Sequence, residues 1–196
     1  KELRMHRWTP KTSAVVGSYN AAFTGITNCN KIYSLIEGEN IQNKEQILAE
    51  IRAVRAFWYY ILLDYYGNVP IVTDFKDTSL PKTKDRKEVY EFVVSELVAV
   101  KDQLRSDVTT ASYGKATQGM AYTLLAKVYL NAMVWNPDGG AKWQECIDAC
   151  AKVLSLGYTL ELNWKVNFAV QNQNSKEIIF PIVFSTADGG NTLQNS

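Results

Sequence analysis

The chain has 196 residues and a net charge of +1, which leaves room for one domain with a sizeable core and argues against nucleic-acid binding through bulk charge. Apolar residues make up 46% and charged residues 21%, an ordinary balance for a globular protein. The longest apolar run is interrupted by Arg55 and Asp64, so no membrane-spanning segment is expected.

The cysteine and histidine content argues against a metal site, a disulfide framework and a histidine-based catalyst. The three cysteines, Cys29, Cys146 and Cys150, are odd in number and form no CxxC pair. Cys146 and Cys150 stand four residues apart on a predicted helix, where we expect both to be small buried residues. The single histidine, His6, lies alone in an irregular start. Phosphate-binding glycine loops and GxSxG or HExxH motifs are absent from the sequence, so no cofactor is expected.

Two long helices are predicted first. Residues 13–37 carry apolar side chains at steps of three and four, and a turn follows at residues 38–40. Residues 44–66 repeat the pattern and add a second stripe of mostly small residues, Ala49, Ala53, Ala56 and Tyr60. Small residues let a neighbouring helix approach closely, so this helix is expected to have neighbours on two sides. Gly67 and Pro70 then stop it.

The middle of the chain is predicted to be extended and then helical. Residues 71–75 read as an apolar extended piece, and residues 76–84 as a polar linker. Asp85 and Glu88 have the spacing of a capping box, in which each side chain binds the other residue's backbone N–H. They predict a helix whose apolar face continues as far as Leu104.

Two further helices and two strands complete the prediction. After a loop at residues 105–114, helices are expected at residues 115–135 and 141–156. Residues 158–162 and 177–184 read as extended, and Pro181 confines the second of these strands to a sheet edge or a short pair.

The last two helices indicate a helical repeat. The spacing of Tyr122, Leu125, Ala126 and Tyr129 reproduces the first helix of a tetratricopeptide repeat. Residues 143–154 fit its second helix, with the cysteines where the two helices cross. The predicted fold is therefore mainly α, with tetratricopeptide-like antiparallel helix pairs in an αα superhelix, loops, and a short β element near the C-terminus.

The charged residues of the predicted helices are expected to be structural. Carboxylates at five helical positions lie near Lys or Arg, where a solvated ion pair is expected: Glu50, Asp64, Glu88, Glu91 and Glu96. Arg52 and Arg55 share one edge of the second helix, and Asp64 lies further along it. We interpret these as groups that tie the helix to adjacent loops through hydrogen bonds.

The sequence resembles a known family over nearly its whole length. The runs AEIRAVRAFWYY at residues 49–60 and LDYYGNVPIV at residues 63–72 resemble the signature of the SusD/RagB family of nutrient-binding outer-membrane lipoproteins of Bacteroidota. Residues 88–97 and 114–130 are similar to later family segments, in the same order. Lysine stands at two positions in the second of these where arginine is usual, Lys115 and Lys127, which puts any bidentate contact there in doubt.

The resemblance implies a function as well as a fold. Residues 1–196 would form one SusD-like helical domain, a fragment of a longer protein. Such a protein is a surface-exposed lipoprotein of the outer membrane that captures an oligosaccharide or polysaccharide and delivers it to a SusC-like TonB-dependent transporter. Membrane association would come only from a lipid anchor outside this chain, and neither nucleic acid nor cofactor is implied.

Ligand-binding residues do not follow from the family motifs, because the sugar-stacking rings of this family come from variable loops. Asp188 and Asn191, in a glycine-containing loop, are the expected ligand-binding residues, since their side chains can bond sugar hydroxyls. Trp8 looks exposed, but its W-P motif favours a structural role. Three alternatives stay open: a peptide-binding member of the same family, a tetratricopeptide-like interaction scaffold, and a glycosidase, although no catalytic set can be assembled.

Overall fold

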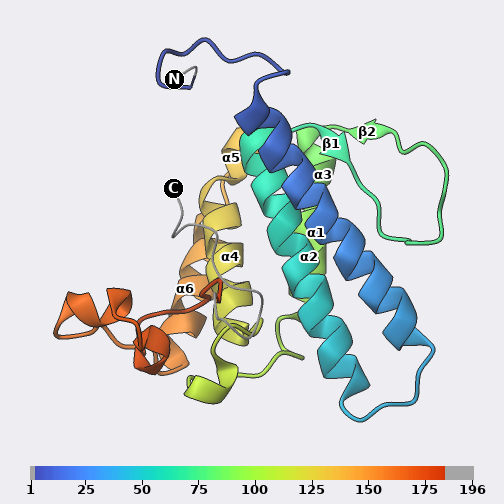
Figure 1. Cartoon of the computed structure of the whole chain (residues 1–196). Coiled ribbons are helices and arrows are strands. Elements are labelled where there is room, and N and C mark those ends of the chain that lie inside the picture. The colour runs from blue at the N-terminus through green and yellow to red at the C-terminus, as the bar shows by residue number, and fades with distance from the viewer. Residues whose placement is uncertain (1–2, 184–196) are drawn as a thin grey trace.

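The computed structural model describes residues 3–183 and is mainly helical (Figure 1). Helices α1 (Ser13–Glu37) and α2 (Lys44–Tyr66) lie side by side and antiparallel, with the bounds that the sequence predicts. The end of α2 is set by Gly67, whose φ of 73° suits glycine and whose N–H donates to Leu62 O and Leu63 O at 3.2 and 3.1 Å. None of the described helices combines the length and the apolar character that crossing a bilayer requires.

Helix α2 is the centre of the described fold. It packs against α1 on one side and against α3 (Arg86–Val100) on the other, which confirms the prediction of two neighbours. The small residues Ala53 and Ala56 are fully buried and allow this close approach. The predicted capping box begins α3, since Asp85 Oδ1 accepts from Glu88 N at 2.8 Å and Glu88 Oε2 accepts from Asp85 N at 3.2 Å.

A pair of antiparallel strands, each two residues long, joins the end of α2 to the start of α3. Strand β1 (Val69–Pro70) pairs antiparallel with β2 (Thr83–Lys84), and Val69 lies opposite Lys84. The segment expected to be a polar linker therefore ends in a short strand. Asn68 Oδ1 also accepts from Arg86 N at 2.9 Å, so the loop between the strands leaves and returns beside the same helix end (Figure 1).

The second helix pair consists of α4 (Gln118–Leu130) and α6 (Trp143–Ser155), which pack along each other. The single helix predicted over residues 115–135 is wrong in its length, because Asn131 separates α4 from a short α5 (Ala132–Trp135). The Asn131 side chain donates to Lys127 O at 3.0 Å and so ends the hydrogen-bonded ladder of α4.

The exposure of the cysteines corrects the sequence prediction. Cys146 is half-buried, whereas Cys150 is exposed. The buried residue of α6 at the crossing with α4 is Ala149, one position earlier. Successive residues of a helix differ by about 100° in direction, so burying Ala149 turns Cys150 toward solvent.

The two strands predicted near the C-terminus do not form within residues 158–183. Two 3₁₀ helices occur elsewhere in the described residues, and two more, η3 (Trp164–Phe168) and η4 (Asn172–Asn174), separate the expected strands. The expected strands are joined mainly by carboxylates: Glu161 N donates to Glu177 Oε2 at 2.9 Å, and Lys176 N donates to Glu161 Oε1 at 3.0 Å. Side-chain carboxylates thus accept hydrogen bonds from backbone N–H groups in place of a strand ladder, and Pro181 has no backbone N–H to donate.

Candidate functional site

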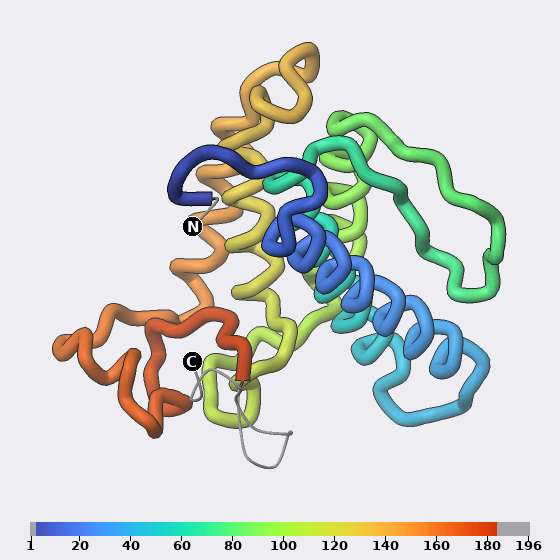
Figure 2. Tube along the Cα trace, turned by 45° about the horizontal axis from the view of Figure 1, so that its top comes forward, coloured from blue at the N-terminus to red at the C-terminus, as the bar shows by residue number. Residues whose placement is uncertain are grey.

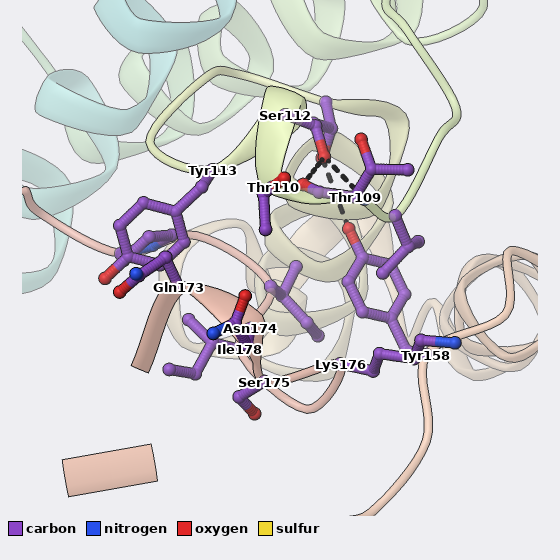
Figure 3. Close-up of a pocket in the computed structure, with 14 residues that line it drawn as sticks. Thr109, Thr110, Ser112, Tyr113, Tyr158, Gln173, Asn174, Ser175, Lys176 and Ile178 are labelled. Carbon is purple, nitrogen blue, oxygen red and sulfur yellow. Dashed lines mark hydrogen bonds between the residues drawn. The ribbon is translucent and has the colours of Figure 1, made fainter. Parts of the chain in front are cut away.

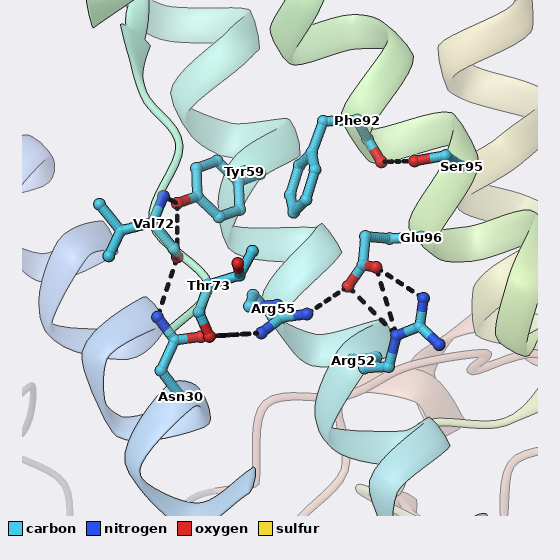
Figure 4. A network of polar contacts seen from close by, with 9 residues as sticks. All are labelled: Asn30, Arg52, Arg55, Tyr59, Val72, Thr73, Phe92, Ser95 and Glu96. Carbon is cyan, nitrogen blue, oxygen red and sulfur yellow. Dashed lines mark hydrogen bonds and ion pairs between the residues drawn. The ribbon is translucent and has the colours of Figure 1, made fainter. Parts of the chain in front are cut away.

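The arginines of α2 lie in a buried polar network that joins three helices (Figure 4). Arg55 donates to Glu96 Oε2 on α3 at 2.6 Å and to Asn30 Oδ1 on α1 at 2.9 Å. Arg52 donates to Glu96 Oε1 at 2.6 Å from the more exposed side. Asn30 in turn donates to Val72 O at 2.9 Å. The two arginines therefore hold α2 mainly to the neighbouring helices α1 and α3, whereas the sequence predicts ties to adjacent loops, of which the Arg55 bond to Thr73 O at 3.4 Å is one.

The acid of this network differs from the one that the sequence suggested. The pairing carboxylate is Glu96, not Asp64, and the whole residue is only 7% exposed. Burial raises the pKa of Glu96, but hydrogen bonds from Arg52 and Arg55 and their charges outweigh it, so that the pKa lies below its usual value. The expectation of a solvated pair is wrong for Glu96 and right for Glu88, which pairs with Lys84 at 2.8 Å in the open. The Glu96 carboxylate offsets one of the two guanidinium charges, and the network serves the fold.

An open hollow of about 720 Å³ lies where the segment before α1 crosses the end of α2. Two large rings border it and are open to solvent, since Trp8 is 51% and Tyr65 is 63% exposed. We call this region the aromatic hollow, and its lining residues are Leu3, Trp8, Thr9, Pro10, Ala14, Val15, Ser18, Tyr65 and Tyr66. The hollow thus offers two ring faces beside small polar groups.

The floor of the aromatic hollow is fixed by hydrogen bonds. Tyr66 Oη donates to Val15 O at 2.7 Å and also bonds Ser18 Oγ, while the Tyr66 ring meets Tyr19 edge to face at 5.3 Å between centroids. The turn that carries Trp8 is closed by Thr9 N, which donates to Thr12 Oγ1 at 2.9 Å. The site is therefore largely preformed, which lowers the entropic cost of binding a ligand.

The sequence alone does not predict the aromatic hollow. The W-P motif predicts a structural role for Trp8, whereas its ring is open to solvent and contacts His6 at 5.4 Å between centroids. Tyr65 falls on the apolar period of α2, yet it is exposed. The adjacent pair of tyrosines was the available signal, because two consecutive helical residues cannot both point into one core, and Tyr66 occupies the inner position. The predicted ligand residues Asp188 and Asn191 lie outside the described residues.

Comparisons with a family model and with known proteins point to the same family. The model of a SusD-like family, described as starch-binding and associating with the outer membrane, matches residues 1–130. The starch-binding protein SusD of Bacteroides thetaiotaomicron is 28% identical over 179 residues, which are 89% of this chain and 32% of that protein. The chain therefore spans about a third of the length of this relative.

Two solved structures share the fold. A SusD superfamily protein from Parabacteroides distasonis superposes with a TM-score of 0.85 at 22% identity, over 95% of this chain and 41% of that one. Surface glycan-binding protein A from Bacteroides thetaiotaomicron, solved in complex with laminarihexaose, gives a TM-score of 0.74 at 21% identity, over 87% of this chain and 36% of that one. The fold is thus that of SusD-like proteins. With two thirds of its residues matched by the family model, the chain belongs to the SusD-like family.

Proposed function

We propose that this chain is part of an outer-membrane protein that captures an oligosaccharide at the cell surface and passes it to a SusC-like TonB-dependent transporter. Membership of a family described as starch-binding supports the ligand class. The observation that carries the proposal is the pair of open rings, Trp8 and Tyr65, at one preformed hollow. Capture involves binding without cleavage of the glycan.

The mechanism we propose is stacking of sugar rings on aromatic faces. A pyranose has an apolar face of C–H groups and an equator of hydroxyls, so it fits a large ring bordered by polar groups. Trp8 and Tyr65 provide the faces, and the hydroxyls of Thr9 and Ser18 lie in the same lining. A volume of about 720 Å³ lies well within the range of small-molecule sites and suits several linked sugar units.

Delivery and location are further parts of the proposal. The family description, which associates these proteins with the outer membrane, supports attachment there, and the resemblance of residues 49–72 supports a surface lipoprotein with a transporter partner. Purification of the full-length protein from its own membrane tests this directly. Recovery of a TonB-dependent barrel is expected, and recovery of peptide ligands alone would favour the peptide-binding alternative.

Removing both rings of the aromatic hollow is expected to abolish detectable glycan binding. Each ring contributes about tenfold in affinity, on the order of 1.4 kcal/mol, so Trp8→Ala and Tyr65→Ala together cost about a hundredfold. Affinity electrophoresis in gels that contain starch, laminarin or xyloglucan measures the retardation of the chain and identifies the polymer. The melting temperature of the double variant is expected to stay near that of the parent, since both rings are exposed.

The matched control is Trp164→Ala. Trp164 is 64% exposed and also contacts a second ring, Phe168, at 5.8 Å, but it belongs to η3 rather than to the hollow. Loss of retardation in this control as well would mean that exposed aromatic rings bind the polymer non-specifically. Retention of binding in the Trp8 and Tyr65 variant would overturn the aromatic hollow as the site. Release of shorter glycans would instead support a glycosidase.

A further inference from the structure

A second cavity, separate from the aromatic hollow, has a volume of about 300 Å³ and polar walls (Figure 3). Its lining comes from the loop at residues 108–117, from Tyr158 after α6, and from residues 173–181. Figure 2 shows the last of these segments, in red, folded back beside the loop that precedes α4. We call it the loop cavity, since its walls come from loops and 3₁₀ turns rather than from the long α-helices.

The walls of the loop cavity are held by their own hydrogen bonds. Ser112 Oγ accepts from Thr109 N at 3.0 Å and donates to Thr109 O at 2.8 Å, which closes the turn on one side. Tyr113 Oη donates to Asn172 Oδ1 at 2.7 Å and so joins this turn to the opposite wall. The cavity is therefore present before any ligand arrives.

The position of Tyr158 depends on a glycine of α4. A Cβ atom at Gly119 would lie only 2.2 Å from Tyr158 Oη, so the ring rests directly on the helix backbone. The Tyr158 hydroxyl also lies 3.4 Å from Thr117 Oγ1, at the start of α4. One face of the cavity is thus an aromatic ring in a defined place.

Three polar side chains of the lining are available to a ligand. Thr110, Gln173 and Asn174 make no side-chain hydrogen bond to any other residue between positions 3 and 183. A hydroxyl and two carboxamides each offer both a donor and an acceptor. They surround the same space as the tyrosine rings in Figure 3. This pairing of uncharged donors and acceptors with an apolar surface suits a ligand that has hydroxyls and a C–H face.

The charge of the lining narrows the ligand class. Among residues 3–183, no carboxylate lines the loop cavity and Lys176 is the one charged lining residue, with an exposed side chain. Ile178 and the ring of Tyr158 add apolar surface. A volume of about 300 Å³ lies at the lower end of small-molecule sites and suits one sugar ring rather than a chain. We propose that the loop cavity binds a single neutral pyranose unit, as a site distinct from the aromatic hollow.

This inference rests on the proposed function for its ligand class, so the experiment must separate the two sites. We would titrate the ¹⁵N-labelled chain with methyl α-glucopyranoside, methyl β-glucopyranoside and glucuronate. The side-chain amide signals of Gln173 and Asn174 are expected to shift with either glucoside and to shift less with glucuronate. In a Gln173→Ala and Asn174→Ala double variant, the backbone signals of Thr110 are expected to report binding about tenfold weaker.

The matched control replaces one asparagine and one glutamine elsewhere. Asn40 and Gln42 are exposed in the loop between α1 and α2, and alanine at both should leave the titration unchanged. The Trp8 and Tyr65 variant is expected to keep the Gln173 and Asn174 shifts while losing polymer retardation. If the parent chain bound polymer but showed no shifts of Gln173 and Asn174, the loop cavity alone would be overturned. If it showed neither polymer binding nor these shifts, both proposals would be overturned. Stronger shifts with glucuronate than with the glucosides would overturn the assignment of a neutral ligand.

Discussion

Replacement of Glu96 by alanine is expected to lower the free energy of unfolding by about 3–5 kcal/mol. The carboxylate accepts from Arg52 and Arg55 at 2.6 Å each, and the Arg55 side chain is only 6% exposed. Without Glu96, the Arg55 guanidinium stays buried with Asn30 and the Thr73 carbonyl as its remaining hydrogen-bond acceptors in the described structure. An uncompensated buried charge costs far more than a lost surface pair.

Chemical denaturation of the Glu96→Ala variant, followed by circular dichroism, measures this loss. Glu145→Ala is the matched control, because Glu145 also pairs with a cation, Lys142 at 3.2 Å, but on the exposed face of α6. The control is expected to change stability by about 0–1 kcal/mol. Equal effects of the two substitutions would contradict the idea that burial makes the Glu96 network important.

The same network is expected to depend on pH. The folded-state pKa of Glu96 lies below its ordinary value of 4.5, so the ionised carboxylate stabilises the fold above that pH. This contribution is lost as the pH falls through the lower, folded-state value, because the unfolded chain binds the proton first. The stability difference between the parent chain and a Glu96→Gln variant should therefore shrink as the pH is lowered below 4.5.

Much of the helical fold could be predicted because its signals are local. The apolar period and Gly67 define α2, and the Asp85 and Glu88 spacing defines the start of α3. The errors arise where side chains compete with the backbone. Asn131 ends α4 early, and the Glu177 carboxylate takes the amide of Glu161 that a strand ladder would have needed. Such competition depends on which side chains meet in space, and a helical or strand period does not report it.

The candidate sites could be predicted less well, because they join segments that are distant in the sequence. Glu96 fits the helical period of α3, but only the packing of α3 on α2 shows that it faces Arg55. The aromatic hollow likewise needs Trp8 before α1 and Tyr65 at the end of α2 to meet. The sequence predicts ligand binding at Asp188 and Asn191, which lie outside the described residues, so this assignment stays a prediction.

Replacement of Tyr59 by phenylalanine is expected to destabilise the chain by about 1–3 kcal/mol, although it removes a single oxygen atom. Tyr59 is fully buried on α2, and its hydroxyl accepts from Val72 N at 2.7 Å and donates to Val72 O at 3.1 Å. Phenylalanine leaves the Val72 N–H without this acceptor in a part-buried place. Burial raises the pKa of Tyr59 to about 12, so the phenol stays neutral throughout the measurement.

Two companion variants separate the hydroxyl from the ring. Tyr59→Ala also removes the edge-to-face contact with Phe92, at 4.9 Å between centroids, and is expected to cost about 3–5 kcal/mol. Tyr65→Phe, on the same helix but exposed, should change stability by no more than about 0.5 kcal/mol. If Tyr59→Phe were as mild as Tyr65→Phe, the hydroxyl would not be what holds Val72 to α2. The Tyr59 ring, with the hydrogen bonds from Asn30 to Val72 O and from Arg55 to Thr73 O, would then fix the segment that follows β1.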